Sequence, residues 1–224
     1  MTGRVPELTL RQRFVKRTFD LTLALLVLAL LGWVILLAWL AASIDTRSNG
    51  MFSQPRIGRW GRPFTIYKIK TMRPRPGIDT TVTTRQDARI TPLGKWLRRM
   101  KVDELPQFFN VLRGDMSVVG PRPDVAGFAD RLTGGDRALL SLRPGITGPA
   151  TLAFRNEEEL LVGVADPDAY NREAIYPAKV ALNLRYLEDY SFRLDWRLVL
   201  ATALGRGWEA AGKAPLPAGK DPLS

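Results

Sequence analysis

The longest apolar run of the chain extends from Leu21 to Ile44, and no charged residue interrupts it. As a helix it would be about 36 Å long, and the hydrocarbon core of a bilayer is about 30 Å thick. The run is also longer than the apolar core of a signal peptide, which has about 7–15 residues. The pattern therefore predicts a membrane helix within a basic N-terminal segment, residues 1–48.

Positive residues lie on both sides of this run. Arg11, Arg13, Lys16 and Arg17 precede it, and Arg47, Arg56, Arg59 and Arg62 follow it. Because positive flanks stay in the cytoplasm, a straight helix would place one of them on the wrong side of the membrane. A helix that bends back to the same face satisfies both flanks, so we favour a re-entrant helix over a spanning one. Gly32, near its midpoint, is only a weak helix breaker.

After residue 48, short periodic stretches alternate with turn residues, which is typical of a small domain. The predicted strands form a hairpin around residues 60–63, with its second strand at 64–71, and recur at 115–120 and 150–154. The predicted helices lie at 92–100, 105–112, 124–132, 136–142, 155–159, 170–190 and 194–204. The last of these is amphipathic enough to rest on a membrane or on the core.

These elements predict an α+β fold: a membrane-anchored small domain that is rich in helices, with a few short strands and amphipathic interfacial helices. The domain is expected at residues 49–206, with a polar loop at 73–89. Residues 207–224, rich in Ala, Gly, Pro and Lys, are predicted to be a disordered tail. A chain of 224 residues can build one such domain, and no second globular domain is expected.

An adjacent pair of acids, Asp103 and Glu104, opens the predicted helix at 105–112. Asp103 is expected at the N-cap and Glu104 at the first helical position, and Gly114 occupies the place of a C-terminal cap. A helix N-terminus favours negative charge, either its own or that of a bound phosphate. A lone pair of this kind is usually no more than a cap and a first-turn acid.

The basic surroundings of the pair favour a functional site over a simple cap. Lys95, Arg98, Arg99 and Lys101 precede it. Arg122 follows it between two prolines, whose stiff backbone suits a guanidinium that must meet a phosphate. The acidic pair is therefore the candidate centre of the chemistry.

Composition narrows that chemistry. The sequence contains neither Cys nor His, which excludes Cys nucleophiles, His bases and the usual zinc ligand sets. Catalysis must then use carboxylates, Lys, Tyr, hydroxyl groups or a metal with oxygen ligands, and Mg²⁺ suits those ligands. The net charge of +11 and the pI of about 10.4 indicate anionic partners: nucleic acid, a membrane surface or phosphorylated substrates.

Nucleotide and nucleic-acid motifs are absent from the sequence. Neither a Walker sequence nor G-x-G-x-x-G occurs, so a nucleotide would be held by arginines, a metal and helix ends. No recognition motif or aromatic platform for stacked bases is found, so nucleic acid is not an expected partner. A non-catalytic, membrane-tethered binder of anionic lipid or nucleic acid remains the alternative to an enzyme.

Between Lys16 and Leu204, six motifs in order resemble those of the bacterial sugar transferases, the small monotopic phosphoglycosyl transferases. They are Lys16-Arg17-x-x-Asp20; residues 56–58 through 67–72; residues 89–94; Asp103-Glu104-Leu105-Pro106-Gln107; residues 114–123; and Arg143-Pro144-Gly145-Ile146-Thr147-Gly148. Any one of them could arise by chance, whereas the ordered set is specific.

The resemblance implies an enzyme that transfers a sugar 1-phosphate from a UDP-sugar to polyprenyl (undecaprenyl) phosphate and releases UMP, which begins surface glycan assembly. It further implies that Asp103 is the nucleophile of a covalent phosphosugar intermediate and binds Mg²⁺. Glu104 matches the partner acid, which orients or deprotonates the lipid phosphate. Arg98 and Arg122 match arginines that contact phosphate, with Lys68 and Arg143 as weaker matches.

By the same resemblance, the domain is expected on the cytoplasmic face of the bacterial inner membrane, in contact with phospholipid. A monomer or homodimer is expected, with downstream glycosyltransferases as candidate partners. Two positions depart from the family pattern. Gly32-Trp33 occupies the place of a Ser-Pro pair in the membrane helix, and Lys70 replaces an Arg that follows Lys68 by two residues, which removes a bidentate donor.

Overall fold

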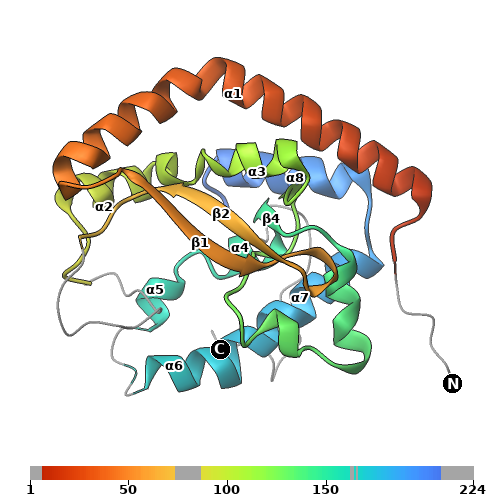
Figure 1. The fold of residues 1–224 in the computed structure, drawn as a ribbon. Helices are drawn as coiled ribbons and strands as arrows, with labels where there is room; N and C mark the ends of the chain where they lie inside the picture. Colours follow the sequence, from red (N-terminus) through yellow and green to blue (C-terminus); the bar gives the residue numbers. More distant parts are fainter. Residues whose placement is uncertain (1–6, 74–86, 162–163, 165, 208–224) are drawn as a thin grey trace, which may run out of the picture.

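The computed structural model describes residues 7–73, 87–161, 164 and 166–207 (Figure 1). The helices are α1 (Leu10–Thr46), α2 (Pro92–Arg99), α3 (Gln107–Arg113), α4 (Pro149–Ala153), α5 (Glu157–Leu160), α6 (Pro167–Tyr170), α7 (Tyr176–Glu188) and α8 (Phe192–Ala203). The strands are β1 (Met51–Ile57), β2 (Pro63–Ile69), β3 (Ser117–Val119) and β4 (Gly145–Thr147). This helix-rich mixture with short strands confirms the predicted α+β class. The predicted tail from residue 208 on and residues 74–86 of the polar loop lie outside the described residues.

Helix α1 is longer than the predicted membrane helix and begins at Leu10. Thr9 and Gln12 form a reciprocal capping box there, which starts the helix well before the uncharged run. Figure 1 shows α1 as an arch that bends near its middle, with both ends directed toward the rest of the molecule. In the described part of the chain it is the one helix that is long and apolar enough to cross a membrane, judged by length and composition.

Large apolar side chains are exposed along the middle and end of α1. They are Leu25, Leu26, Leu30, Leu31, Trp33, Leu36, Leu37, Leu40 and Ile44. A continuous apolar surface of this kind marks an interaction site or a membrane contact. The arrangement indicates membrane association.

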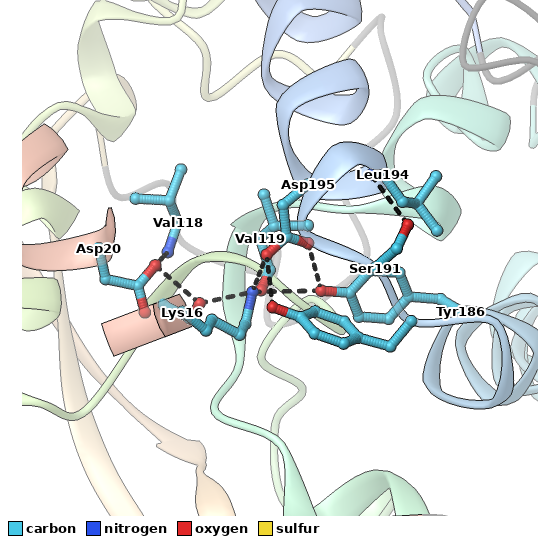
Figure 2. Close-up of polar contacts among 10 residues, drawn as sticks. Lys16, Asp20, Val118, Val119, Tyr186, Ser191, Leu194 and Asp195 are labelled. Carbon is cyan, nitrogen blue, oxygen red and sulfur yellow. Dashed lines mark hydrogen bonds and ion pairs between the residues drawn. The ribbon is translucent and has the colours of Figure 1, made fainter. Parts of the chain in front are cut away.

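The first turns of α1 are fixed to the domain through buried polar groups (Figure 2). The Lys16 ammonium lies 2.7 Å from the Asp195 carboxylate of α8, which also accepts a 2.6 Å hydrogen bond from the Tyr186 hydroxyl. One turn further on, Asp20 accepts hydrogen bonds from the Val118 amide and the Ser117 hydroxyl of β3, at 2.9 and 3.0 Å. The charged residues before the apolar run are thus partly structural.

The strands form two separate pairs. β1 and β2 are an antiparallel hairpin in register from Met51 opposite Ile69 to Ile57 opposite Pro63, and a 3₁₀ turn at Arg59–Gly61 joins them. The predicted hairpin is therefore confirmed. β3 and β4 pair in parallel, so that Ser117 lies opposite Gly145 and Val119 lies opposite Thr147.

Three sequence-based assignments are wrong. The predicted strand at 150–154 is helix α4, because Pro149 at its first position has a backbone φ that suits a helix start. The predicted helices at 124–132 and 136–142 are 3₁₀ turns at Ala129–Arg131 and Gly134–Ser141. Gly127 and Gly134 adopt left-handed φ angles of 100° and 55°, which do not belong to a right-handed α-helix.

The core lies between α7, α8 and the β3–β4 pair. The predicted apolar face of the 170–190 helix is buried through Leu182, Tyr186, Leu187 and Tyr190. Helix α8, predicted at 194–204, buries Leu194, Asp195, Leu198 and Ala201. It exposes Phe192, Trp196, Leu200 and Leu204 on the other side, and the Trp196 ring lies 5.1 Å from Phe19 of α1, measured between centroids. The apolar surfaces of α1 and α8 are thus adjacent.

Candidate active site

The acidic pair lies in a 3₁₀ turn between two helices rather than at the start of one. Helix α2, capped by Thr91 as predicted, ends at Met100, and Lys101 follows with a left-handed φ of 57°. Val102–Glu104 then form the 3₁₀ turn, and Pro106 occupies the N-cap position of α3 without a side-chain cap bond. The predicted N-cap role of Asp103 is therefore wrong, because Lys101 already occupies the N-cap position of the 3₁₀ turn and Asp103 lies inside that turn. The predicted C-terminal cap at Gly114 is confirmed, with φ of 92°.

Glu104 joins two cations from distant parts of the chain. Its Oε1 atom lies 2.6 Å from Nη2 of Arg122, which follows β3, and 3.2 Å from Nζ of Lys68 in β2. The Glu104 side chain is buried, and Arg122 is the more exposed of its two partners. The structure thus places Glu104 beside Arg122 and Lys68, which are 18 and 36 positions away from it in the sequence.

The two acids are in different electrostatic states. Burial acts to raise the pKa of Glu104, but Arg122 and Lys68 hold that pKa well below its usual value. Burial, and next the neighbouring charge of Glu104, raise the pKa of Asp103. Burial lowers the pKa of Lys68, while Glu104 opposes that shift and also raises the pKa of Arg122. The ion pairs therefore keep Glu104 in its charged form. A further cation would stabilise the charged form of Asp103.

Asp103 has a buried oxygen available for such a cation. The residue is 8% exposed, and its Oδ1 atom has no hydrogen-bond partner. In the described part of the chain, no group of three or more acidic residues could hold a metal by itself. Mg²⁺ is commonly bound through one or two carboxylates together with substrate phosphates and water. A site with one free carboxylate oxygen beside the cations Lys68 and Arg122 fits that pattern.

The two other predicted arginines, Arg98 and Arg143, lie at different distances from the acidic pair. The Arg98 side chain donates to Thr71 Oγ1 and Met72 Sδ, at 2.9 and 3.1 Å, and its positive charge acts on Asp103. Arg143 donates through Nε to the Gly114 carbonyl at 2.8 Å, at the far end of α3 from Glu104. The structure therefore places Arg98 beside the acids, whereas it does not bring Arg143 to them.

Two residues that sequence reasoning did not select support the site. Arg17 donates to the Val111 and Leu112 carbonyls at 2.6 and 3.0 Å and so caps the C-terminal end of α3. Asn110, fully buried in α3, donates to the Thr65 carbonyl at 2.7 Å. It also accepts from the Tyr67 amide at 3.2 Å.

The sequence carries a signal for each of these residues. Asn110 is a polar residue among the apolar positions of its helix, and Arg17 lies between Lys16 and Asp20, which both proved to be buried. Asn110 joins α3 to the strand that carries Lys68, so its position bears directly on the site.

Comparisons with known proteins identify the family of this chain. A family model described as "Bacterial sugar transferase" matches residues 11–206. The undecaprenyl-phosphate glucose phosphotransferase of Komagataeibacter xylinus is 36% identical over 199 residues, which cover 84% of this chain and 35% of that protein. The UDP-glucose:undecaprenyl-phosphate glucose-1-phosphate transferase of Caulobacter vibrioides is 35% identical over 205 residues, covering 89% of this chain and 72% of that protein.

A protein of the same name from Escherichia coli is 34% identical over 196 residues, covering 85% of this chain and 39% of that protein. The chain thus spans little more than a third of two of these three relatives and most of the other. The family match covers the acidic pair, its cations and both apolar helices. The chain belongs to the bacterial sugar transferase family.

Proposed function

We propose that this protein transfers a sugar 1-phosphate from a UDP-sugar to undecaprenyl phosphate, releases UMP and so begins the assembly of a surface glycan. The observation that carries the proposal is the buried, unpartnered Oδ1 atom of Asp103 next to a pair of cations on Glu104. Family membership and the names of the relatives support the same reaction. UDP-glucose is the first donor to test, because two of these names specify it.

In the proposed first step, a carboxylate oxygen of Asp103 attacks the β-phosphorus of the UDP-sugar. A phosphorus–oxygen bond forms to Asp103, and the bond to the bridging oxygen breaks, so that UMP leaves with the electron pair. In the second step, an oxygen of the lipid phosphate attacks the same phosphorus and displaces the Asp103 carboxylate. The products are the diphosphate-linked lipid sugar and the free acid, so the enzyme is regenerated.

The cations of the site have a direct role in this chemistry. A carboxylate and a diphosphate repel each other, and nearby positive charge lowers that barrier. Arg122, Lys68 and Arg98 would supply such charge, since they lie on or beside the two acids. Mg²⁺, bound through Asp103, would neutralise further phosphate charge when present. The low pKa of Glu104 makes it a weak base, so its proposed role is to position Arg122 and Lys68.

The membrane arrangement belongs to the same proposal. Helix α1 is re-entrant and enters the cytoplasmic face of the bacterial inner membrane, where the lipid substrate resides. Basic residues at both ends of α1 and its bent course support this topology. The exposed face of α8 rests on the same lipid surface. The protein acts as a monomer or homodimer and supplies its product to downstream glycosyltransferases.

The reaction is tested with the purified full-length chain, Mg²⁺, undecaprenyl phosphate and a panel of UDP-sugars. We expect UMP release that depends on the lipid acceptor, and we expect Asp103→Asn to abolish it. A wild-type protein that releases no UMP with any donor would favour the alternative, a non-catalytic binder. Unchanged UMP release by Asp103→Asn would remove Asp103 from the proposed nucleophilic role.

The topology is tested with a single cysteine, which the native sequence lacks. In intact cells, a Thr2→Cys variant should not react with a membrane-impermeant thiol reagent. It should react only after the cells are permeabilised. Labelling of Thr2→Cys from outside intact cells would contradict the re-entrant helix.

A further inference from the structure

A cavity of about 60 Å³ is lined in part by Arg122, the residue that pairs with Glu104. Its wall is formed by the end of β1, the segment after β3, the 3₁₀ turn at Gly134–Ser141 and α7. The polar residues of this wall are Arg122, Asp124, Tyr176, Lys179 and Asn183, and the others are mostly aliphatic. We call it the Asn183 pocket.

Arg122 connects the pocket to the reacting groups. It lines the cavity, and its Nη2 atom also donates to Glu104 at 2.6 Å. A phosphate bound to Arg122 would therefore contact a residue of the pocket wall. A group attached to that phosphate would be within reach of the pocket.

Asn183 is the observation that indicates a ligand. The residue is 6% exposed, its Oδ1 atom has no hydrogen-bond partner, and it lies in the pocket wall. A buried polar atom without a partner costs about 1–3 kcal/mol. A ligand with hydroxyl groups would provide that partner.

The other polar groups of the wall are arranged around a second acceptor, Asp124. The backbone carbonyl of Asp124 accepts from the Ile57 amide at 2.9 Å, which fixes the segment against β1. The Tyr176 hydroxyl is hydrogen-bonded to the Asp124 side chain. The Lys179 ammonium is 2.7 Å from the Glu157 carboxylate, so its charge is already paired. The pocket is thus richer in acceptors than in free cationic donors.

We infer that the Asn183 pocket binds the hexosyl group of the UDP-sugar and contributes to the choice of sugar. This inference rests on the proposed function, because it assumes a UDP-sugar donor. Sugar hydroxyls are donors that match Asn183 and Asp124, whereas the edge of uracil presents two carbonyl oxygens and one N–H. The cavity has room for several water molecules, which suits one edge of a pyranose ring.

The test uses Asn183→Leu, which replaces the amide by an apolar group of similar size. Because the substitution removes a buried, unpartnered oxygen, we expect it to fold with an unchanged or higher melting temperature. Asn156→Leu, at an exposed position outside the pocket, is the matched control. Both are made in an Asp103→Asn parent that does not turn over. Titration calorimetry with Mg²⁺ compares UDP, UDP-glucose, UDP-galactose and UDP-N-acetylgalactosamine.

We expect the parent to prefer one UDP-hexose over the weakest by about tenfold, the value of one or two good hydrogen bonds. In Asn183→Leu this preference should fall to within about twofold while the affinity for UDP is unchanged. The control should retain the preference. A parent without preference, or an Asn183→Leu protein that retains it, would overturn the assignment of the pocket.

The same titrations separate this inference from the proposed function. If the wild type releases no UMP but the sugar preference is present and disappears in Asn183→Leu, the pocket is a sugar site and the transfer reaction is wrong. If UMP is released while the preference is unaffected by Asn183→Leu, the transfer reaction stands and the sugar site lies elsewhere.

Discussion

Glu104 holds two cations on a single carboxylate oxygen, and this makes it the residue on which the charge arrangement of the site depends. Its Oε1 atom contacts both Arg122 and Lys68. Glu104→Gln should leave these cations without their counter-ion and let their side chains move away from Asp103. We expect the rate of UMP release to fall about 100-fold, a typical cost for misplaced catalytic groups.

The stability cost of Glu104→Gln is expected to be about 1–3 kcal/mol, because Arg122 is partly exposed and solvent screens its charge. Thermal unfolding measures this cost, and UMP release measures the catalytic effect. Glu173→Gln, at an exposed position on the π turn Asn171–Ile175, is the control and should change neither. A Glu104→Gln protein with wild-type activity would show that the ion pairs are only structural.

Asp124 provides a pH dependence of stability that can be assigned to one group. Burial raises its pKa from 3.8 to about 6, against the opposing effects of Lys179, Arg56 and Arg122. Between about pH 4 and pH 6 the unfolded chain has released this proton and the folded chain retains it. The free energy of unfolding therefore falls as the pH rises through this window and remains lower above it.

Asp124→Asn should remove this pH-dependent contribution. Relative to the wild type, its free energy of unfolding should increase by on the order of 1 kcal/mol between pH 4 and pH 6, then stay constant. Denaturant unfolding at several pH values measures the difference. Parallel curves for the two proteins over this range would contradict the raised pKa.

At the residue scale, the sequence allowed candidate side chains to be selected, but it did not determine their conformations or contacts. Asp103, Glu104, Arg98 and Arg122 could be selected because adjacent acids in a basic segment are unusual, whereas Lys68 was selected through the family resemblance. The N-cap assignment failed because the left-handed turn at Lys101 is not encoded by a Gly or Asn. Arg143 could not be distinguished from Arg98 and Arg122, because its contact with Gly114 depends on tertiary packing.

Helix α1 is fixed to the domain by the ion pair between Lys16 and Asp195, in which both side chains are buried. Lys16→Met would leave the Asp195 charge without its cation, while Tyr186 still donates to it. We expect a loss of about 3–5 kcal/mol in the free energy of unfolding, the usual cost of breaking a buried pair. Unfolding in detergent measures this loss.

The matched control for that prediction is Arg13→Met in the same helix. Arg13 pairs with Glu7 at 2.6 Å, but both side chains are substantially exposed. Its loss should change the stability by less than about 1 kcal/mol. Equal effects of Lys16→Met and Arg13→Met would contradict a buried anchoring role for Lys16.

At the element scale, predictions succeeded where local signals agreed. Thr91 with Pro92 started α2 as expected, and the hairpin and helices α7 and α8 follow their apolar patterns. Prediction failed at 150–154, where a short apolar run fits a strand or a helix equally well. It also missed the start of α1 at the Thr9–Gln12 capping box, because Lys16 and Asp20, which are buried against the domain, resemble a solvated flank in the sequence.

At the scale of the whole molecule, the fold class and the apolar helix could be predicted, but the contacts that assemble the domain could not. Lys16 and Asp195 are 179 positions apart, and Lys68 and Glu104 are 36 apart. Local patterns contain no information about such pairs. The packing of α1 against the turn that carries the acids could therefore be known only from the structure. Under the proposed function, the membrane contact would set the access of the lipid substrate to Asp103.

Leu200 of α8 offers a test of that relation, since its side chain is 53% exposed on the apolar face of the helix. Leu200→Glu would place a charge against the lipid surface and tilt or lift the domain there, while α1 keeps the protein on the membrane. We expect the KM for undecaprenyl phosphate in vesicles to rise about tenfold, equivalent to about 1.4 kcal/mol, with the KM for the UDP-sugar unchanged. Leu200→Ala, which adds no charge, should have a much smaller effect. Equal changes in both KM values would mean that α8 acts through the folding of the site rather than through the membrane.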